Sequence, residues 1–220
     1  MLQPQTLTFL SRLKENNNKP WFDTHKKRYD EARISFIEVV DTIIPAIAKF
    51  DPEIGNLIAK ECVFRINRDV RFSKNKQPYK NNMAAYFNRA GKKGTGAGYY
   101  LHIEPGKSFA AAGIWMPLPE DLLKIRQEID YNFNEWKKII GSASFKNQFE
   151  NGIDKSNSLV RPPKGYEPDN AAIEFIKLKS FVTTKPLPEV DLINKNFVAD
   201  LSKTFKAVKP LIDFINRALD

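Results

Sequence analysis

The chain has 220 residues, of which 42% are hydrophobic and 28% charged, and its formal net charge is +9. This composition is too apolar for a disordered protein, and the length allows a substantial core to be buried. The single cysteine, Cys62, excludes an internal disulfide and a zinc site made of several thiolates, and it suits a reducing compartment.

The first part of the chain has helical spacing. A short helix is predicted over residues 6–16, and Pro20 suits the first turn of another. From Trp21 onward, apolar residues recur every three or four positions, which predicts a long amphipathic helix that is kinked or interrupted at Pro45. The most apolar window, 36–50, carries charges and is too short to cross a bilayer, so no membrane partner is expected. The N-terminal residues do not resemble a secretory signal, and we expect a cytoplasmic protein.

The pattern changes to alternation after Cys62. The sequence VFRINRDVRF, residues 63–72, puts apolar side chains on one face and polar ones on the other, and a period of two predicts a strand. Arg68 falls on the apolar face, where an unpaired arginine is rare. Core positions are expected for Phe64, Phe72 and Phe87.

Three more strand-like segments follow, and the loops between them are too short for parallel crossovers. They cover residues 83–90, 98–105 and 108–117. Helical spacing returns after residue 119 and again from about 191, and 179–188 could form an edge strand. The sequence therefore predicts an α+β fold: a central, mainly antiparallel sheet of four to five strands packed by N- and C-terminal helices. We expect one domain over residues 1–220, helical over 1–58, with the sheet over 62–117 and a helical or mixed part over 119–220.

Nearly all of the excess charge lies in one segment. Residues 60–93 contain ten basic and two acidic side chains, a balance of +8 out of +9. Such a concentrated positive field attracts anions. Guanidinium groups match the geometry of carboxylate and phosphate oxygens.

Five basic residues are therefore the candidate anion-binding groups: Arg65, Arg68, Arg71, Lys76 and Lys80. The one acid among them, Asp69, could orient an arginine or serve as a general base, and Tyr79 could donate a proton. The alternative is a solvated charge ladder in which Asp69 simply pairs with a neighbouring arginine.

The spacing R-x-x-R-D-x-R-F-x-x-N-K-x-x-Y over residues 65–79 resembles the motif of an uncharacterised, mainly bacterial family, domain of unknown function 2461. The segments NNNKPWF, YYLHIEP, GIWMP and RPPKGYEPDN extend the resemblance over nearly the whole chain. The resemblance implies no established activity or cofactor. Two positions depart from the expected pattern: Ala110–Ala112 stand where glycines are expected, and Asn170 stands where a histidine is expected.

Three functions remain open. The first is a pocket, in an enzyme or a binding protein, for a small molecule that carries phosphate or carboxylate. The second is a nucleic-acid binding surface formed by the same basic residues and the 89–93 loop, with aromatic side chains that stack on bases. The third is a structural salt-bridge network without a ligand. His25 and His102 are interpreted as structural, no metal site is predicted, and the sequence identifies neither a cofactor nor an oligomeric state.

Overall fold

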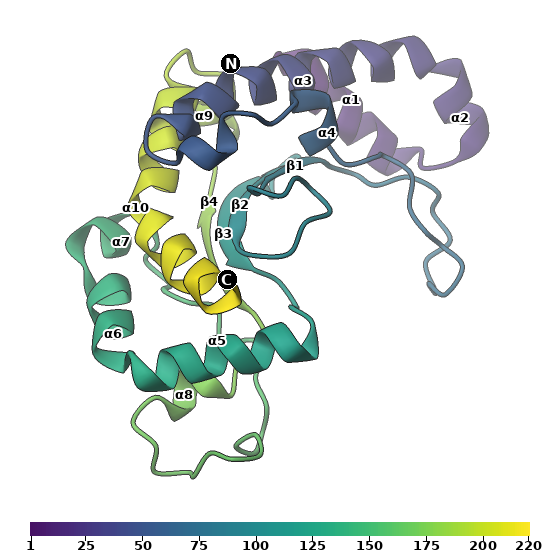
Figure 1. The fold of residues 1–220 in the computed structure, drawn as a ribbon. Coiled ribbons are helices and arrows are strands. Elements are labelled where there is room, and N and C mark those ends of the chain that lie inside the picture. The colour runs from purple at the N-terminus through teal and green to yellow at the C-terminus, as the bar shows by residue number, and fades with distance from the viewer.

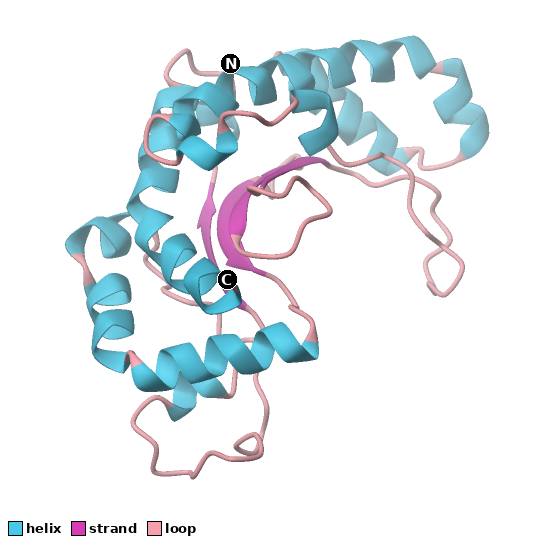
Figure 2. Ribbon diagram, viewed as in Figure 1, coloured by secondary structure: helices cyan, strands magenta, loops and turns pink.

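The centre of the molecule is an antiparallel sheet with the strand order β1-β2-β3-β4. The computed structural model describes residues 1–220, and helices from both ends of the chain pack around this sheet (Figures 1 and 2). The strands are β1 (Met83–Phe87), β2 (Gly98–Ile103), β3 (Phe109–Ile114) and β4 (Phe181–Pro186). The predicted α+β fold with an antiparallel sheet is confirmed, and β4 is an edge strand as expected.

Ten α-helices and one short 3-10 helix surround the sheet. Before it come α1 (Pro4–Glu15), α2 (Lys19–Thr24), α3 (Lys26–Ala48), η1 (Pro52–Ile54) and α4 (Ala59–Cys62). After β3 come α5 (Pro119–Tyr131), α6 (Phe133–Gly141), α7 (Ala143–Gln148), α8 (Ile173–Ile176), α9 (Glu189–Leu192) and α10 (Phe197–Leu219). No helix combines the length and the apolar character needed to cross a bilayer.

The predicted long helix from Trp21 is divided at His25 rather than at Pro45. The His25 ring Nδ1 lies 2.8 Å from the carbonyl oxygen of Trp21, at the junction of α2 and α3. Helix α3 then continues through Pro45 to Ala48.

One face of the sheet is buried under helices. Helices α3 and α10 cover it, and the predicted apolar stripe of α10 is buried as expected. The Phe205 ring of α10 lies 5.1 Å from the Tyr99 ring of β2, between centroids. Because alternate strand residues point to opposite faces, the neighbours of the buried Tyr99 and Leu101 face the other way. The opposite face therefore carries Tyr100 and His102.

The predicted strand over residues 63–72 is wrong. This segment makes one isolated bridge to β1, Val63 to Ala85, and then leaves the sheet. Its later part pairs with its own return leg: the Arg68 N–H donates to the Pro78 carbonyl (2.9 Å) and the Lys80 N–H to the Ile66 carbonyl (2.8 Å). The segment 65–80, here called the arm, projects from the body of the molecule (Figure 1).

The arm has no apolar face to bury at its tip. Phe72 is 96% exposed there, so its predicted core position is wrong. Phe87 is fully buried as predicted, and Phe64 is half-buried at the base of the arm.

A single asparagine side chain fixes the base of the arm. The Asn17 side-chain amide donates to the Tyr79 carbonyl (2.9 Å), and its oxygen accepts from the Tyr79 N–H (3.0 Å). The same amide also donates to Asn81 Oδ1 (2.8 Å). The Asn17 side chain therefore makes the two backbone hydrogen bonds that a neighbouring strand would make to Tyr79. The Tyr79 ring stacks on Phe22, with 4.0 Å between centroids.

Replacing Asn17 with alanine leaves the backbone N–H and carbonyl of Tyr79 without their hydrogen-bond partners. At about 1 kcal/mol for each lost hydrogen bond, we expect Asn17→Ala to lower the free energy of unfolding by about 2 kcal/mol. Urea unfolding followed by circular dichroism measures this. Asn56→Ala is the matched control, because Asn56 is exposed and its side chain makes no hydrogen bond. Equal stability of the two variants would contradict the role of Asn17.

Candidate binding cavity

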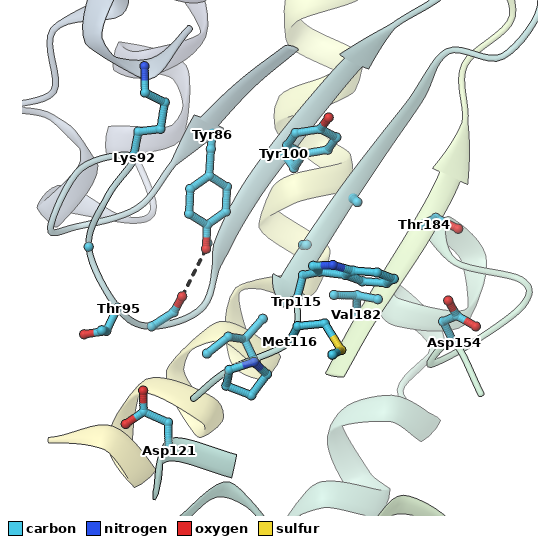
Figure 3. Close-up of a pocket in the computed structure, with 18 of the residues that line it drawn as sticks. Tyr86, Lys92, Thr95, Tyr100, Trp115, Met116, Asp121, Asp154, Val182 and Thr184 are labelled. Carbon is cyan, nitrogen blue, oxygen red and sulfur yellow. Dashed lines mark hydrogen bonds between the residues drawn. The ribbon is translucent and has the colours of Figure 1, made fainter. Parts of the chain in front are cut away.

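The uncovered face of the sheet forms the floor of a cavity of about 660 Å³. Tyr86, Tyr100 and Phe109 stand on this floor, and Phe64 and Trp115 contribute to the walls. Figure 3 shows how Tyr86, Tyr100 and Trp115 surround the hollow. Trp115 is 64% exposed, which is unusual for so large an apolar side chain. The lining therefore offers several aromatic rings to a ligand.

Two glycines on the floor have no room for a side chain. Gly98 lies directly under the Tyr86 ring, where a Cβ atom would come within 2.9 Å of the ring and 2.4 Å of the Phe87 carbonyl oxygen. Gly113 has a φ of +123°, and a Cβ atom there would lie 1.9 Å from the Phe181 carbonyl oxygen. The Tyr86 hydroxyl donates to the Gly96 carbonyl (3.0 Å), which fixes this ring at the edge of the cavity (Figure 3).

Three cations gather where the arm meets the β1–β2 loop. Two of them lie over the same aromatic ring: Lys80 Nζ is 5.4 Å and Lys92 Nζ is 5.5 Å from the centroid of the Phe64 ring. Arg65 is close enough for its charge to act on Lys80. We call Arg65, Lys80 and Lys92 the cationic cluster. Lys92 and Phe64 also line the cavity, so the cluster lies at its margin.

The cationic cluster is not neutralised by the protein. None of its three members forms a salt bridge with a carboxylate. Lys92 Nζ donates to the Val63 carbonyl (2.6 Å), which holds it in place without removing its charge. Burial, with the charges of Arg65 and Lys92, lowers the pKa of Lys80. Mutual repulsion of this kind is relieved when an anion binds.

The other candidate residues of the motif stay within the arm. Arg71 pairs with Asp69 through two side-chain hydrogen bonds of 3.0 and 2.7 Å, and this pairing lowers the pKa of the exposed Asp69 carboxyl. The Arg68 guanidinium donates to the Gln77 carbonyl (3.0 Å). Lys76 Nζ donates to the Val70 carbonyl (3.1 Å), which closes the tip. Of the seven motif residues predicted to form the site, the structure brings only Arg65 and Lys80 to the cavity margin.

The sequence interpretation missed a polar chain on β2. The Tyr100 hydroxyl lies 3.1 Å from His102 Nδ1, and His102 Nε2 lies 3.2 Å from Glu104 Oε2. The Phe109 ring stacks on the imidazole at 4.6 Å. Burial lowers the pKa of His102 and outweighs the opposite effect of Glu104. The signal was present in YYLHIE, because residues two apart on a strand share one face.

No group of three or more His, Cys, Asp or Glu side chains is placed to hold a metal ion. Cys62 is buried, and burial raises the pKa of its thiol to about 11. A thiol with such a pKa is unreactive at neutral pH. The ionisable side chains that line the cavity are those of Tyr86, Tyr100, Lys92, Asp121 and Asp154.

Comparison with protein families supports the resemblance seen in the sequence. The model of the family described as conserved hypothetical protein (DUF2461) matches residues 5–214. The chain belongs to this family. A comparison with curated proteins and one with solved structures each found no match. The family description names no activity, so the function must be argued from the cavity itself.

Removing the charge of Lys80 should not harm the fold. The pKa of Lys80 is lower in the folded protein than its ordinary value of 10.5, so keeping the charge there costs stability at neutral pH. This cost disappears as the pH rises through the window between the lowered pKa and 10.5. We expect Lys80→Met to raise the thermal midpoint by about 1–3 °C at pH 7, and by less at pH 10.5.

Differential scanning fluorimetry at the two pH values measures this effect. Lys74→Met is the control, because Lys74 is exposed at the tip of the arm. A lower midpoint for Lys80→Met at pH 7, or a gain that does not change with pH, would contradict the repulsion within the cationic cluster.

Proposed function

We propose that the cavity binds a small anionic ligand that also has a planar, apolar part. The observation that carries this proposal is the cationic cluster, whose three positive side chains have no carboxylate partner and lie beside an aromatic cavity. Ion-paired side chains would instead favour a purely structural role. The ligand's acid group, phosphate or carboxylate, would lie against Arg65, Lys80 and Lys92.

The size and lining of the cavity fit this ligand class. A volume of about 660 Å³ lies within the range of about 300–1,000 Å³ that is usual for small-molecule sites. Aromatic side chains stack on planar groups, and a few polar groups then fix the orientation. Nucleotides and aromatic acids combine the two required parts.

The charges on the cavity also suggest how the ligand is oriented. Asp121 and Asp154 line the cavity as well, and Figure 3 shows Lys92 near the top of the view and Asp121 near the bottom. Carboxylates repel an acid group and accept hydrogen bonds from donors. The acid end of the ligand would therefore point to Lys92, and a donor such as an amino or hydroxyl group would point to Asp121.

A fluorescent aromatic anion tests the proposal. The probe is 8-anilinonaphthalene-1-sulfonate, and the matched neutral probe is N-phenyl-1-naphthylamine, which has the same rings without the sulfonate. Loss of one charged hydrogen bond costs about 1.5 kcal/mol. We therefore expect Lys92→Gln to weaken binding of the anionic probe about tenfold and to leave binding of the neutral probe unchanged.

Lys93→Gln is the control for this titration, because Lys93 is exposed and carries the same charge one residue away. If Lys92→Gln and Lys93→Gln weaken binding of the anionic probe equally, the probe is attracted only by the overall positive charge of the protein and not by a specific site. If the anionic probe binds no better than the neutral one, the proposed anion site does not exist.

Single-stranded nucleic acid is the second candidate ligand, and the tip of the arm favours it. Phe72 is 96% exposed, and the Arg71 guanidinium lies 5.8 Å from the centroid of its ring. Lys74 and Lys76 are exposed beside it. An exposed aromatic ring among cations is the arrangement with which proteins stack bases and hold phosphates.

Filter binding of a ten-residue oligothymidylate at low salt tests this second candidate. Loss of one base stack costs about 1–3 kcal/mol, so Phe72→Ala should weaken binding by about tenfold. The affinity should also fall steeply as salt is added. No retention of the oligonucleotide by the wild-type protein at low salt would exclude this function.

A further inference from the structure

We propose that Tyr100, His102 and Glu104 form a relay that makes the Tyr100 hydroxyl a nucleophile within the cavity. The cavity would then be an active site for group transfer from an anionic aromatic substrate with an electrophilic acyl, phosphoryl or sulfonyl centre. This inference rests on the proposed function for its substrate class, but the reactivity of Tyr100 can be measured separately.

The direction of the hydrogen bonds carries the argument. A carboxylate has no proton to donate, so His102 Nε2 must carry the hydrogen that Glu104 Oε2 accepts at 3.2 Å. A neutral imidazole then has a lone pair on Nδ1. The Tyr100 hydroxyl, 3.1 Å from Nδ1, must therefore be the donor. The chain of bonds points the phenolic proton toward a base that is oriented by a carboxylate, as in other activated nucleophiles.

The side chains around His102 keep its imidazole buried and neutral. The side chains of His102 and Glu104 are only 12% and 18% exposed, and the Phe109 ring covers the imidazole. The strand partners of His102 are Ala84 and Phe109, which carry no charge. Tyr100 and Glu104 are the titratable groups hydrogen-bonded to His102, and Glu104 is the charged group that acts on its pKa. Because burial lowers its pKa, His102 is neutral and able to accept a proton at pH 7.

Only the first member of the relay lines the cavity. Tyr100 is part of the floor, whereas His102 and Glu104 follow it along the chain and are not among the lining residues. In the reaction the phenolic oxygen would form a bond to the electrophilic centre while its proton passes to His102 Nδ1. Glu104 would stabilise the resulting imidazolium, and the leaving group would depart with the electrons of the broken bond. No oxidant or reductant is needed.

The test uses 4-carboxybenzenesulfonyl fluoride, an anionic aromatic electrophile, and benzenesulfonyl fluoride, which lacks the carboxylate. Tyr100 attacks sulfur, the S–F bond breaks, and fluoride and the phenolic proton are released. Peptide mass spectrometry gives the labelling rate of each tyrosine in the same sample. Tyr131, which is 79% exposed, serves as the internal reference for a solvent-exposed tyrosine.

We expect Tyr100 to be labelled faster than Tyr131 by either reagent at pH 8. General-base assistance is worth about 10²–10⁴-fold, so His102→Gln should slow the labelling of Tyr100 by more than about tenfold. Glu104→Gln keeps an oxygen acceptor without its charge, and should give an intermediate rate. Thermal unfolding of each variant confirms that it is folded.

The pH profile separates the relay from a structural role. In the wild type the rate should rise as His102 loses its proton, below pH 6.5, and then stay flat, because burial raises the pKa of Tyr100 to about 12. In His102→Gln it should climb steadily with pH toward the pKa of the phenol. A wild-type profile that climbs like that of His102→Gln would overturn the relay.

The two reagents distinguish the relay from the anion site. If only the relay is correct, Tyr100 reacts in a His102-dependent way but equally fast with both reagents. If only the anion site is correct, Lys92→Gln weakens the reversible binding of 4-carboxybenzenesulfonyl fluoride, while Tyr100 reacts no faster than Tyr131. The second result would refute the inference and leave the proposed function intact.

Discussion

The cationic cluster depends on how the arm is held at the edge of the sheet, because the arm carries Arg65 and Lys80. Val63 makes one bridge to β1, and the Asn17 side chain then takes the place of a strand beside Tyr79. Phe64 follows the first anchor and Lys80 follows the second, and both lie next to the β1–β2 loop, which contributes Lys92. Lys80 of the arm and Lys92 of the β1–β2 loop thus meet around the Phe64 ring. The fold supplies the stability that offsets their repulsion.

This arrangement divides the basic motif into two parts with different physical roles. Arg68, Arg71 and Lys76 are hydrogen-bonded to groups of the arm itself, so they maintain its shape. Arg65 and Lys80 have no such partner; Lys80 lies over the Phe64 ring, which lines the cavity, and Arg65 is close enough for its charge to act on Lys80. The proposed ligand site therefore combines part of the motif with Lys92 and the aromatic floor, whereas the exposed tip around Phe72 forms a separate surface.

The sequence predicted the sheet well, because short loops between alternating segments leave little choice but an antiparallel meander. It could not predict the arm. Alternation over 63–72 shows that the backbone is extended, but not that the partner of Ile66 and Arg68 is the return leg at 78–80. The cavity could not be predicted from the sequence for a similar reason. The segment GYYLHI has large side chains on both faces, and only the packing of α10 on Tyr99 decides that Tyr100 and His102 lie on the face away from α10.

The central claim is that Arg65, Lys80 and Lys92 form one unneutralised cluster, and the protonation of Lys80 reports on it directly. NMR titration of the ¹³Cε resonance of Lys80 gives its pKa in the wild type, in Lys92→Gln, and with 8-anilinonaphthalene-1-sulfonate bound. The account predicts a pKa below 10.5 in the free wild type, because of burial and the neighbouring charges, and a rise in the other two samples. A Lys80 that titrates at 10.5 in all three samples would contradict it.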